Sequence, residues 1–429
     1  AEMAINIGRA TAYMFKKKGH VAKIIVGKDT RISGYMFESA LVSGICSMGV
    51  NAIMVGVMPT PGIAFLTRAL RLDAGIVISA SHNPFEDNGI KFFSSDGFKL
   101  PDELEQKIEE LVQDDNLGFR RPSGTDIGKA YRLEDATGRY IEYVKATIPR
   151  GSTLEGLRVV VDSANGAAYK VTSWLLKELG AEVISINDKP DGVNINAHCG
   201  CMDMEGLCRA VKMHRAHVGI AHDGDADRTL LCDERGRVVD GDLIMGIWAL
   251  QMKKAGRLQG NTVVATVMSN LGLEHYLMRN GITLVRTKVG DRFVVEKMIE
   301  GGYLLGGEQS GHIICLECNT TGDGPITALN ILHMIKKEQT PLSKLVAGIK
   351  LYPQVLINVP VEKRIDIKSS SAVTEKIRDA ETRLGERGRV LVRPSGTEHK
   401  IRVMVEADDR RLAQRHAQGI AEAVKKTLA

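Results

Sequence analysis

Two short loops contain the residue types that point most directly to a chemistry. The first loop runs Ser79-Ala80-Ser81-His82-Asn83-Pro84 and the second Asp223-Gly224-Asp225-Ala226-Asp227-Arg228. Three carboxylates at alternate positions of a tight turn can direct their oxygens at one hard divalent cation. A cation held there would neutralise a phosphate carried by a serine hydroxyl. The two loops together predict phosphoryl transfer through a phosphoserine at Ser81.

Two other interpretations of the aspartate loop fit its residues less well. Glu234 is the twelfth residue counted from Asp223, as in a calcium EF-hand, but the sixth is Arg228, where that motif needs glycine. A solvated acidic turn without metal is the other alternative, and such turns rarely alternate carboxylates in front of an arginine. We therefore expect Mg²⁺, held by Asp223, Asp225 and Asp227 together with Ser81.

Polar residues in three further segments are candidates for substrate binding. Glu308 and Ser310, which lie between glycines, could bind sugar hydroxyls, with an ordinary strand-end turn as the alternative. Lys91 follows the turn Asn88-Gly89 and could reach the same site, although a surface lysine is an equally good interpretation. A guanidinium, two hydroxyls and glycine-freed backbone amides suit a phosphate dianion, and a plain hairpin turn would not explain so many donors. These last groups belong to Arg393, Ser395, Gly396 and Thr397.

Composition limits the class of protein. The 429 residues are 44% hydrophobic and 25% charged, enough for two to four domains with proper cores. A net charge of +5, with both signs interspersed, favours small anionic metabolites over nucleic acid. The longest apolar runs are of strand length, and we see no signal peptide, so we expect a cytoplasmic protein without a membrane partner.

Seven cysteines are an odd number for a disulfide framework, and we expect them to be reduced. Cys199 and Cys201 form one close pair and Cys315 and Cys318 another, which admits zinc as an alternative. The stretch after Ile313 has the alternation of a strand, so packing thiols are the better interpretation.

Strand and helix patterns alternate along most of the chain, and this predicts α/β architecture. Each candidate loop follows a predicted strand: Gly75–Ser79 before the serine loop, Val218–Ala221 before the aspartates, and Tyr303–Leu305 before the segment 306–312. We predict three similar α/β domains with mixed sheets and a C-terminal α+β domain around a central cleft. The expected boundaries are 1–140, 141–238, 239–348 and 349–429.

The four loops, taken in order, resemble the signature loops of the α-D-phosphohexomutase superfamily, and the match covers nearly the whole chain. The segments 28–31 and 288–292 fit as well, and the second of these, with Gln309, favours the glucosamine branch over phosphomannomutase or phosphoglucomutase. The resemblance implies interconversion of glucosamine 6-phosphate and glucosamine 1-phosphate, a step toward UDP-N-acetylglucosamine. It implies a phosphoserine, Mg²⁺ and a hexosamine 1,6-bisphosphate as activator and intermediate. A phosphomannomutase or phosphoglucomutase, or a non-catalytic sugar-phosphate-binding protein, stays open as an alternative, and a homodimer is an assembly we allow for.

The resemblance also assigns roles to particular residues. Phosphoryl transfer would use Ser81, Lys91, Arg228 and His312. The sugar and its nonreacting phosphate would contact Lys288, Glu308, Ser310, Arg393, Ser395, Gly396, Thr397 and Arg402.

This sequence departs from the family pattern at three places. The family's opening Gly-Thr-Asp-Gly-Ile-Arg-Gly segment does not occur in it, and we expect no activity or lower activity without the arginine of that segment. His399 stands where proline is usual, and Ala226 replaces a glycine. A methyl group at position 226 is tolerable only if that residue avoids strongly positive φ.

Overall fold

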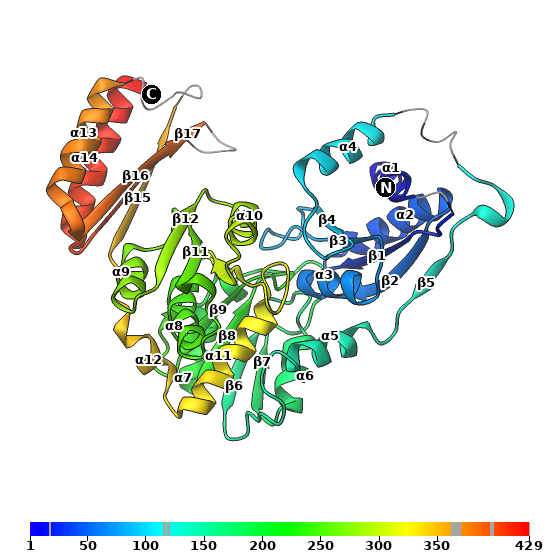
Figure 1. Cartoon of the computed structure of the whole chain (residues 1–429), viewed down its shortest axis with the longest axis horizontal. Helices are drawn as coiled ribbons and strands as arrows, with labels where there is room; N and C mark the ends of the chain where they lie inside the picture. Colours follow the sequence, from blue (N-terminus) through cyan, green and yellow to red (C-terminus); the bar gives the residue numbers. More distant parts are fainter. Residues whose placement is uncertain (17–18, 115–116, 118–120, 362–369, 395–398, 429) are drawn as a thin grey trace. The chain divides into compact units, whose positions relative to one another are not determined.

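The computed structural model describes residues 1–16, 19–114, 117, 121–361, 370–394 and 399–428, and it contains four β-sheets (Figure 1). The chain forms two compact units. The first comprises Ala1–Val267 with Leu284–Ala347, and the second Met268–Thr283 with Gly348–Ala429. No helix among the described residues is long and apolar enough to cross a bilayer.

The first sheet carries the serine loop. Its order is β4-β3-β1-β2-β5, with β3 and β4 antiparallel and the other neighbours parallel. The strands are β1 (Lys23–Lys28), β2 (Asn51–Val57), β3 (Ala74–Ile78), β4 (Ile90–Ser94) and β5 (Ala130–Arg132). The helices are α1 (Glu2–Phe15), α2 (Ser33–Ser47), α3 (Thr60–Ala69) and α4 (Asp102–Val112).

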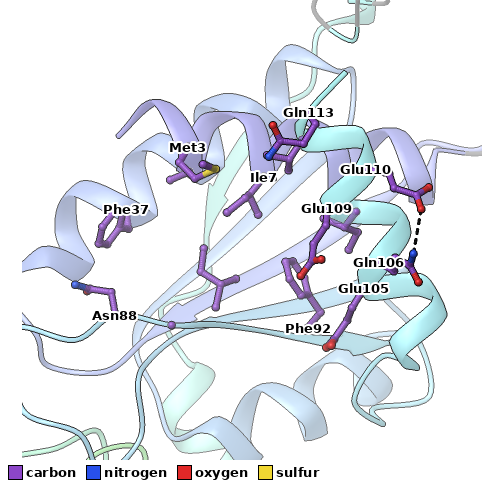
Figure 2. Close-up of a pocket in the computed structure, with 15 residues that line it drawn as sticks. Met3, Ile7, Phe37, Asn88, Phe92, Glu105, Gln106, Glu109, Glu110 and Gln113 are labelled. Carbon is purple, nitrogen blue, oxygen red and sulfur yellow. Dashed lines mark hydrogen bonds between the residues drawn. The ribbon is translucent and has the colours of Figure 1, made fainter. Parts of the chain in front are cut away.

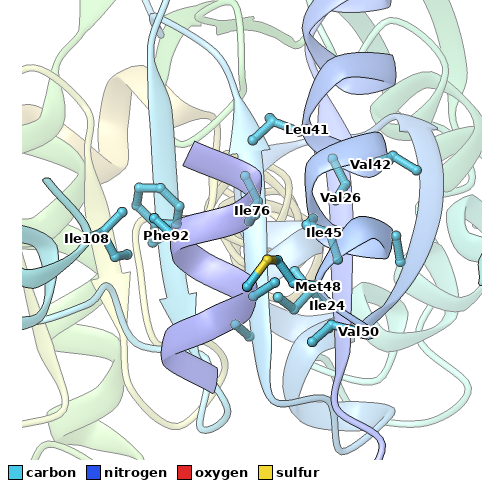
Figure 3. Close-up of a cluster of buried hydrophobic side chains, with 14 of the residues drawn as sticks. Ile24, Val26, Leu41, Val42, Ile45, Met48, Val50, Ile76, Phe92 and Ile108 are labelled. Atoms are coloured by element: carbon cyan, nitrogen blue, oxygen red, sulfur yellow. The ribbon is translucent and has the colours of Figure 1, made fainter. Parts of the chain in front are cut away.

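Alternation along the strands sends apolar side chains to both faces of this sheet. Ile24, Val26 and Ile76 pack with residues of α1, α2 and α4 in one buried cluster (Figure 3). On the opposite face, Gly27 and Gly75 lie against α3, where a Cβ on either would come within 3.1 Å of Ile63. Glycine at these two positions therefore lets α3 approach the sheet closely.

A groove of about 790 Å³ lies beside this sheet (Figure 2). It is lined by apolar side chains from α1, β4 and α4, among them Ile7, Phe92 and Ile108, and by carboxylates of α4 such as Glu105 and Glu109. Asn88 and Gly89, from the loop between β3 and β4, also line the groove, whereas Ser81 and the three aspartates do not.

The second and third sheets are also mixed. Their orders are β10-β9-β8-β6-β7 and β12-β11-β13-β14, and each has an antiparallel edge beside a parallel pair. The second sheet contains β6 (Arg158–Asp162), β7 (Glu182–Ile186), β8 (Val218–His222), β9 (Thr229–Asp233) and β10 (Val238–Val239), with helices α5 (Ala136–Lys145), α6 (Val171–Glu178) and α7 (Glu205–Met213). The third contains β11 (Thr262–Thr266), β12 (Thr283–Thr287), β13 (Leu305–Gly307) and β14 (Ile313–Cys315), with α8 (Gly241–Lys254), α10 (Asp291–Gly301), α11 (Gly324–Glu338) and α12 (Leu342–Leu345).

The second unit is built on a three-stranded antiparallel sheet of order β15-β17-β16. It contains β15 (Gln354–Pro360), β16 (Gly388–Pro394), β17 (Lys400–Ala407), α13 (Ser371–Leu384), α14 (Arg410–Leu428) and α9 (Leu271–Arg279). The fully buried Glu406 joins these parts, because it pairs with Arg389 and accepts a hydrogen bond from the backbone N–H of Leu271. The prediction of three α/β domains and a C-terminal α+β domain is confirmed at the level of architecture.

One predicted strand is displaced along the chain. β13 begins at Leu305, where the predicted strand Tyr303–Leu305 ends, because Gly306 and Gly307 pair with β14. A Cβ on Gly306 would lie 2.6 Å from the sulfur of Met298, so the glycine is needed for close packing of α10 on the sheet.

Candidate active site

Ser81 lies in the loop that follows β3, and side chains from distant segments hold the backbone of this loop. Its φ is 51°, in the left-handed region that non-glycine residues rarely adopt. Two side chains donate to carbonyls of this loop. Asn196 Nδ2 lies 2.9 Å from the Ser81 carbonyl oxygen and 3.0 Å from that of Asn83, and Arg31 Nη2 lies 2.6 Å from the Asn83 oxygen. These donors stabilise the unusual conformation that presents the Ser81 hydroxyl.

The aspartate loop follows β8 and meets the serine loop directly. The Ser81 hydroxyl donates to Asp223 Oδ2 at 2.7 Å. A Cβ on Gly224 would lie 2.6 Å from the Ser81 carbonyl oxygen, so a glycine here allows the two loops to touch. The two loops that the sequence separates by about 140 residues thus form one site.

Ala226 does not meet the condition we set for its methyl group. Its φ is 55°, so it adopts the left-handed conformation in which a glycine would be at ease. Two backbone hydrogen bonds hold Ala226 in place: its N–H donates to the Asp223 carbonyl at 3.1 Å, and its own carbonyl accepts from the Gly324 N–H at 3.0 Å. An alanine there costs about 1–2 kcal/mol of conformational energy.

The three aspartates are arranged to hold a cation. Each offers an oxygen, and these three atoms lie within 4.8 Å of one another. Asp225 Oδ1 and Asp227 Oδ1 are buried without a hydrogen-bond partner. A buried carboxylate oxygen that accepts no hydrogen bond is energetically unfavourable, and a divalent cation would stabilise both oxygens. The aspartate cluster therefore fits a divalent metal ion.

Lys91 reaches this cluster from β4. Its Nζ lies 2.6 Å from Asp225 Oδ2 and 3.1 Å from Asp227 Oδ2. Burial opposes the charged lysine, yet Asp225 and Asp227 raise the pKa of Lys91 above its usual value. Burial and the two neighbouring carboxylates raise the pKa of Asp223, whereas Lys91 and His312 overcome burial and lower the pKa of Asp227.

The segment 308–312 between β13 and β14 is the third loop of the site. Its residue His312 links the aspartates to α10. Its Nδ1 lies 3.5 Å from Asp227 Oδ1 and its Nε2 lies 3.5 Å from Asp291 Oδ2. The backbone N–H of Gly322 donates to Nε2 at 3.2 Å. Asp291 in turn pairs with Lys99, which follows β4. The charges of His312 and Lys99 outweigh the effect of burial and lower the pKa of Asp291 to about 2.

Glu308 and Ser310 lie together after β13. Ser310 Oγ is 3.2 Å from Glu308 Oε2, and the Gly290 N–H donates to Glu308 Oε1 at 3.2 Å. Burial opposes the charge of Arg228, but Asp223, Asp227 and Glu308 raise its pKa. The three loops therefore place hydroxyls, carboxylates and cationic groups around one site.

Lys288, two residues before Gly290, has its Nζ 5.7 Å from the ring centre of Phe293.

The second unit carries two of the predicted phosphate contacts. Arg393 on β16 is paired in register with Arg402 on β17. Burial and the charge of Arg402 lower the pKa of Arg393. Two guanidinium groups on neighbouring strands favour the binding of an anion. The other predicted contacts, Ser395, Gly396 and Thr397, lie outside the described residues.

Models of the phosphoglucomutase/phosphomannomutase family match along the chain. Alpha/beta/alpha domain I matches residues 1–118, domain II 138–236, domain III 240–352 and the C-terminal domain 356–423. The chain is 56% identical to a phosphoglucosamine mutase of Thermodesulfovibrio yellowstonii, over 95% of this chain and 91% of the relative. It is 54% identical to one of Geobacter sp., over 100% of this chain and 94% of the relative.

The chain belongs to the phosphoglucomutase/phosphomannomutase family. The superfamily resemblance seen in the sequence is thereby confirmed, and the chain is a phosphohexomutase enzyme. Solved structures agree on the fold. A family protein of Burkholderia thailandensis has a TM-score of 0.81 at 24% identity, covering 99% of this chain and 93% of that chain. N-acetylphosphoglucosamine mutase of Aspergillus fumigatus has a TM-score of 0.70 at 20% identity, covering 99% and 98%.

Sequence reasoning missed two residues that shape the site of this phosphohexomutase. Asn196 and Thr60 touch the serine and aspartate loops from distant segments, and neither stands in a recognisable motif. Cys315 ends β14 and Cys318 lies in the next turn, and both are buried free thiols, as expected for packing. Among the described residues, the aspartates alone form a cluster of potential metal ligands.

Proposed function

We propose that this phosphohexomutase interconverts glucosamine 6-phosphate and glucosamine 1-phosphate, with Ser81 as the phosphoryl carrier. The observation that supports this reaction best is the Ser81 hydroxyl 2.7 Å from Asp223, beside the aspartate cluster and Lys91. The curated relatives named phosphoglucosamine mutase, at 54–56% identity, support glucosamine phosphate as the substrate.

The reaction begins from phosphorylated Ser81. The free hydroxyl of the sugar phosphate attacks the phosphorus, the bond from phosphorus to Ser81 Oγ breaks, and the hydroxyl proton passes to a base. A hexosamine 1,6-bisphosphate results. The sugar then turns end for end, and its other phosphoryl group returns to Ser81, which frees the isomeric monophosphate.

The charges around Ser81 suit this transfer. Lys91, Arg228 and His312 are the candidates for balancing charge and moving the proton. Asp223, Asp225 and Asp227 would hold Mg²⁺, which when bound neutralises charge on the transferring phosphoryl group. Mg²⁺ as the ion and a hexosamine 1,6-bisphosphate as the activator are both part of the proposal.

Sugar binding is assigned to the third loop and the second unit. Glu308 and Ser310 would hold hydroxyls in both orientations of the sugar, since the 3- and 4-hydroxyls exchange similar places when it turns. Arg393 and Arg402 would bind the nonreacting phosphate, together with the segment 395–397. We also propose a cytoplasmic location, where such metabolites are made.

Substrate preference tests the assignment. We expect kcat/KM to be higher for glucosamine 1-phosphate than for glucose or mannose 1-phosphate at one fixed concentration of bisphosphate activator. Equal values for glucose and glucosamine would make the enzyme a broad phosphohexomutase. Binding of all three sugars without turnover would identify a non-catalytic sugar-phosphate-binding protein.

A further inference from the structure

Thr60 contacts the aspartate cluster from outside the three loops. It opens α3, beside the first sheet, and it is fully buried. Its hydroxyl lies 2.5 Å from Asp225 Oδ2, and its backbone N–H donates to the Asp225 carbonyl oxygen at 3.0 Å. One residue thus holds both the main chain and the side chain of Asp225.

The start of α3 is itself fixed. Pro61 occupies the first turn of the helix, and its carbonyl accepts a hydrogen bond from Asn319 Nδ2 at 3.1 Å. The Thr60 hydroxyl is therefore presented from a rigid element, and it constrains the orientation of the Asp225 carboxylate.

The two oxygens of Asp225 have different surroundings. Oδ2 accepts from Thr60 Oγ1 and from Lys91 Nζ, whereas Oδ1 is buried and has no hydrogen-bond partner. The donors on Oδ2 leave a single oxygen of this carboxylate for a cation.

We propose that Thr60 is a positioning residue that makes Asp225 a one-oxygen ligand and so favours Mg²⁺ over Ca²⁺ at the aspartate loop. This inference rests on the proposed cation site. Mg²⁺ demands a compact octahedral arrangement, while Ca²⁺ accepts more oxygens and binds carboxylates through both of theirs. A carboxylate free to turn would lose its preorganisation for Mg²⁺ and could offer both oxygens to Ca²⁺.

The test is calorimetric titration of the metal-free protein with MgCl₂ and, separately, CaCl₂. Thr60→Val removes the hydroxyl at nearly constant volume. We expect its Kd for Mg²⁺ to rise roughly 10- to 100-fold, as is typical when a partner of a metal ligand is lost. We expect a smaller rise for Ca²⁺, so that the ratio of the two affinities shifts toward Ca²⁺. Thr60→Ser keeps the hydroxyl and should restore the parental ratio.

Thr67→Val is the matched control. Thr67 is buried on the same helix, and its hydroxyl donates to the Ile63 carbonyl at 2.8 Å, away from the aspartates. Should Thr60→Val fail to fold, Thr60→Ala removes the same hydroxyl without adding a methyl group and serves in its place.

The outcomes separate the two proposals. A parent protein that binds neither cation overturns the cation site and this inference with it. A parent that binds Mg²⁺, with a Mg²⁺/Ca²⁺ ratio unchanged in Thr60→Val, overturns the role of Thr60 alone. The same shift in Thr67→Val would also overturn it, because the effect would then belong to the packing of α3.

Discussion

At the scale of single residues, the site depends on backbone conformations that side chains ordinarily avoid. Ser81 and Ala226 both have φ above 50°, and each lies in one of the two loops that meet. Such residues persist where the surroundings hold them, as Asn196 and Arg31 hold the serine loop. Strain of this kind is concentrated at the reacting hydroxyl and the proposed metal ligands.

Gly224→Ala tests the contact between these loops. The new methyl group would lie 2.6 Å from the Ser81 carbonyl oxygen, so one loop must move. We expect a loss of about 1–3 kcal/mol in stability from overpacking and roughly 100-fold in kcat, because catalytic groups displaced by about 1 Å lose that much. Gly206→Ala in α7 is the control, since a Cβ there meets no atom within 4 Å. Unchanged kcat in Gly224→Ala would show that this contact does not set the geometry of catalysis.

At the scale of elements, a buried hydrogen-bond network joins α5 to α11. The Tyr140 hydroxyl lies 2.8 Å from each oxygen of Asp323, which also accepts from Asn319 and caps α11. Burial raises the pKa of Asp323 to about 6, although these hydrogen bonds oppose the rise. Because its folded pKa is raised, the stability that Asp323 contributes is present at low pH and lost as pH rises from about 4 to about 6.

Tyr140→Phe should destabilise the protein more at pH 8 than at pH 5, because the Tyr140 hydroxyl donates to Asp323 and stabilises the charged form of that carboxylate. At pH 8 the lost bond is to a charged carboxylate, worth about 1.5–3 kcal/mol, and at pH 5 to a mostly neutral one, worth about 0.5–1.5 kcal/mol. Urea midpoints at the two pH values measure this. Tyr143→Phe is the control, because its hydroxyl donates to the Cys318 carbonyl, which does not titrate. An equal loss at both pH values for Tyr140→Phe would contradict the account.

The pairing of β16 with β17 leads to a prediction about phosphate binding by Arg393. Arg393→Lys keeps the charge but cannot form the bidentate bonds that a guanidinium makes to phosphate. We expect KM for either sugar phosphate to rise by roughly 10- to 100-fold, equivalent to about 1.5–3 kcal/mol for a hydrogen bond to a charged group. Arg411→Lys, on the exposed start of α14, should leave KM unchanged. Parental kinetics in Arg393→Lys would show that Arg393 does not bind the phosphate.

At the scale of the whole molecule, the sequence could predict those features of the site that depend on residues close together along the chain. The serine loop, the aspartates and Glu308 each follow a strand, so their place at strand ends could be read from local patterns. Thr60 and Asn196 could not be found this way. Their partners are 165 and 115 residues away, and the contacts exist only because separate sheets pack together. The shift of β13 likewise reflects the pairing of Gly306 and Gly307 with β14, which overrides the usual weakness of glycine in strands.

The central claim is that Ser81 carries the phosphoryl group, and mapping of the modified residue tests it most directly. The protein is incubated with a hexose 1,6-bisphosphate, and peptide mass spectrometry locates the added phosphoryl group while mutase activity is followed in parallel. We predict one phosphoryl group on Ser81, and in Ser81→Ala neither that modification nor turnover, with folding retained. Phosphorylation at another residue, or activity of Ser81→Ala within tenfold of the parent, would contradict the account.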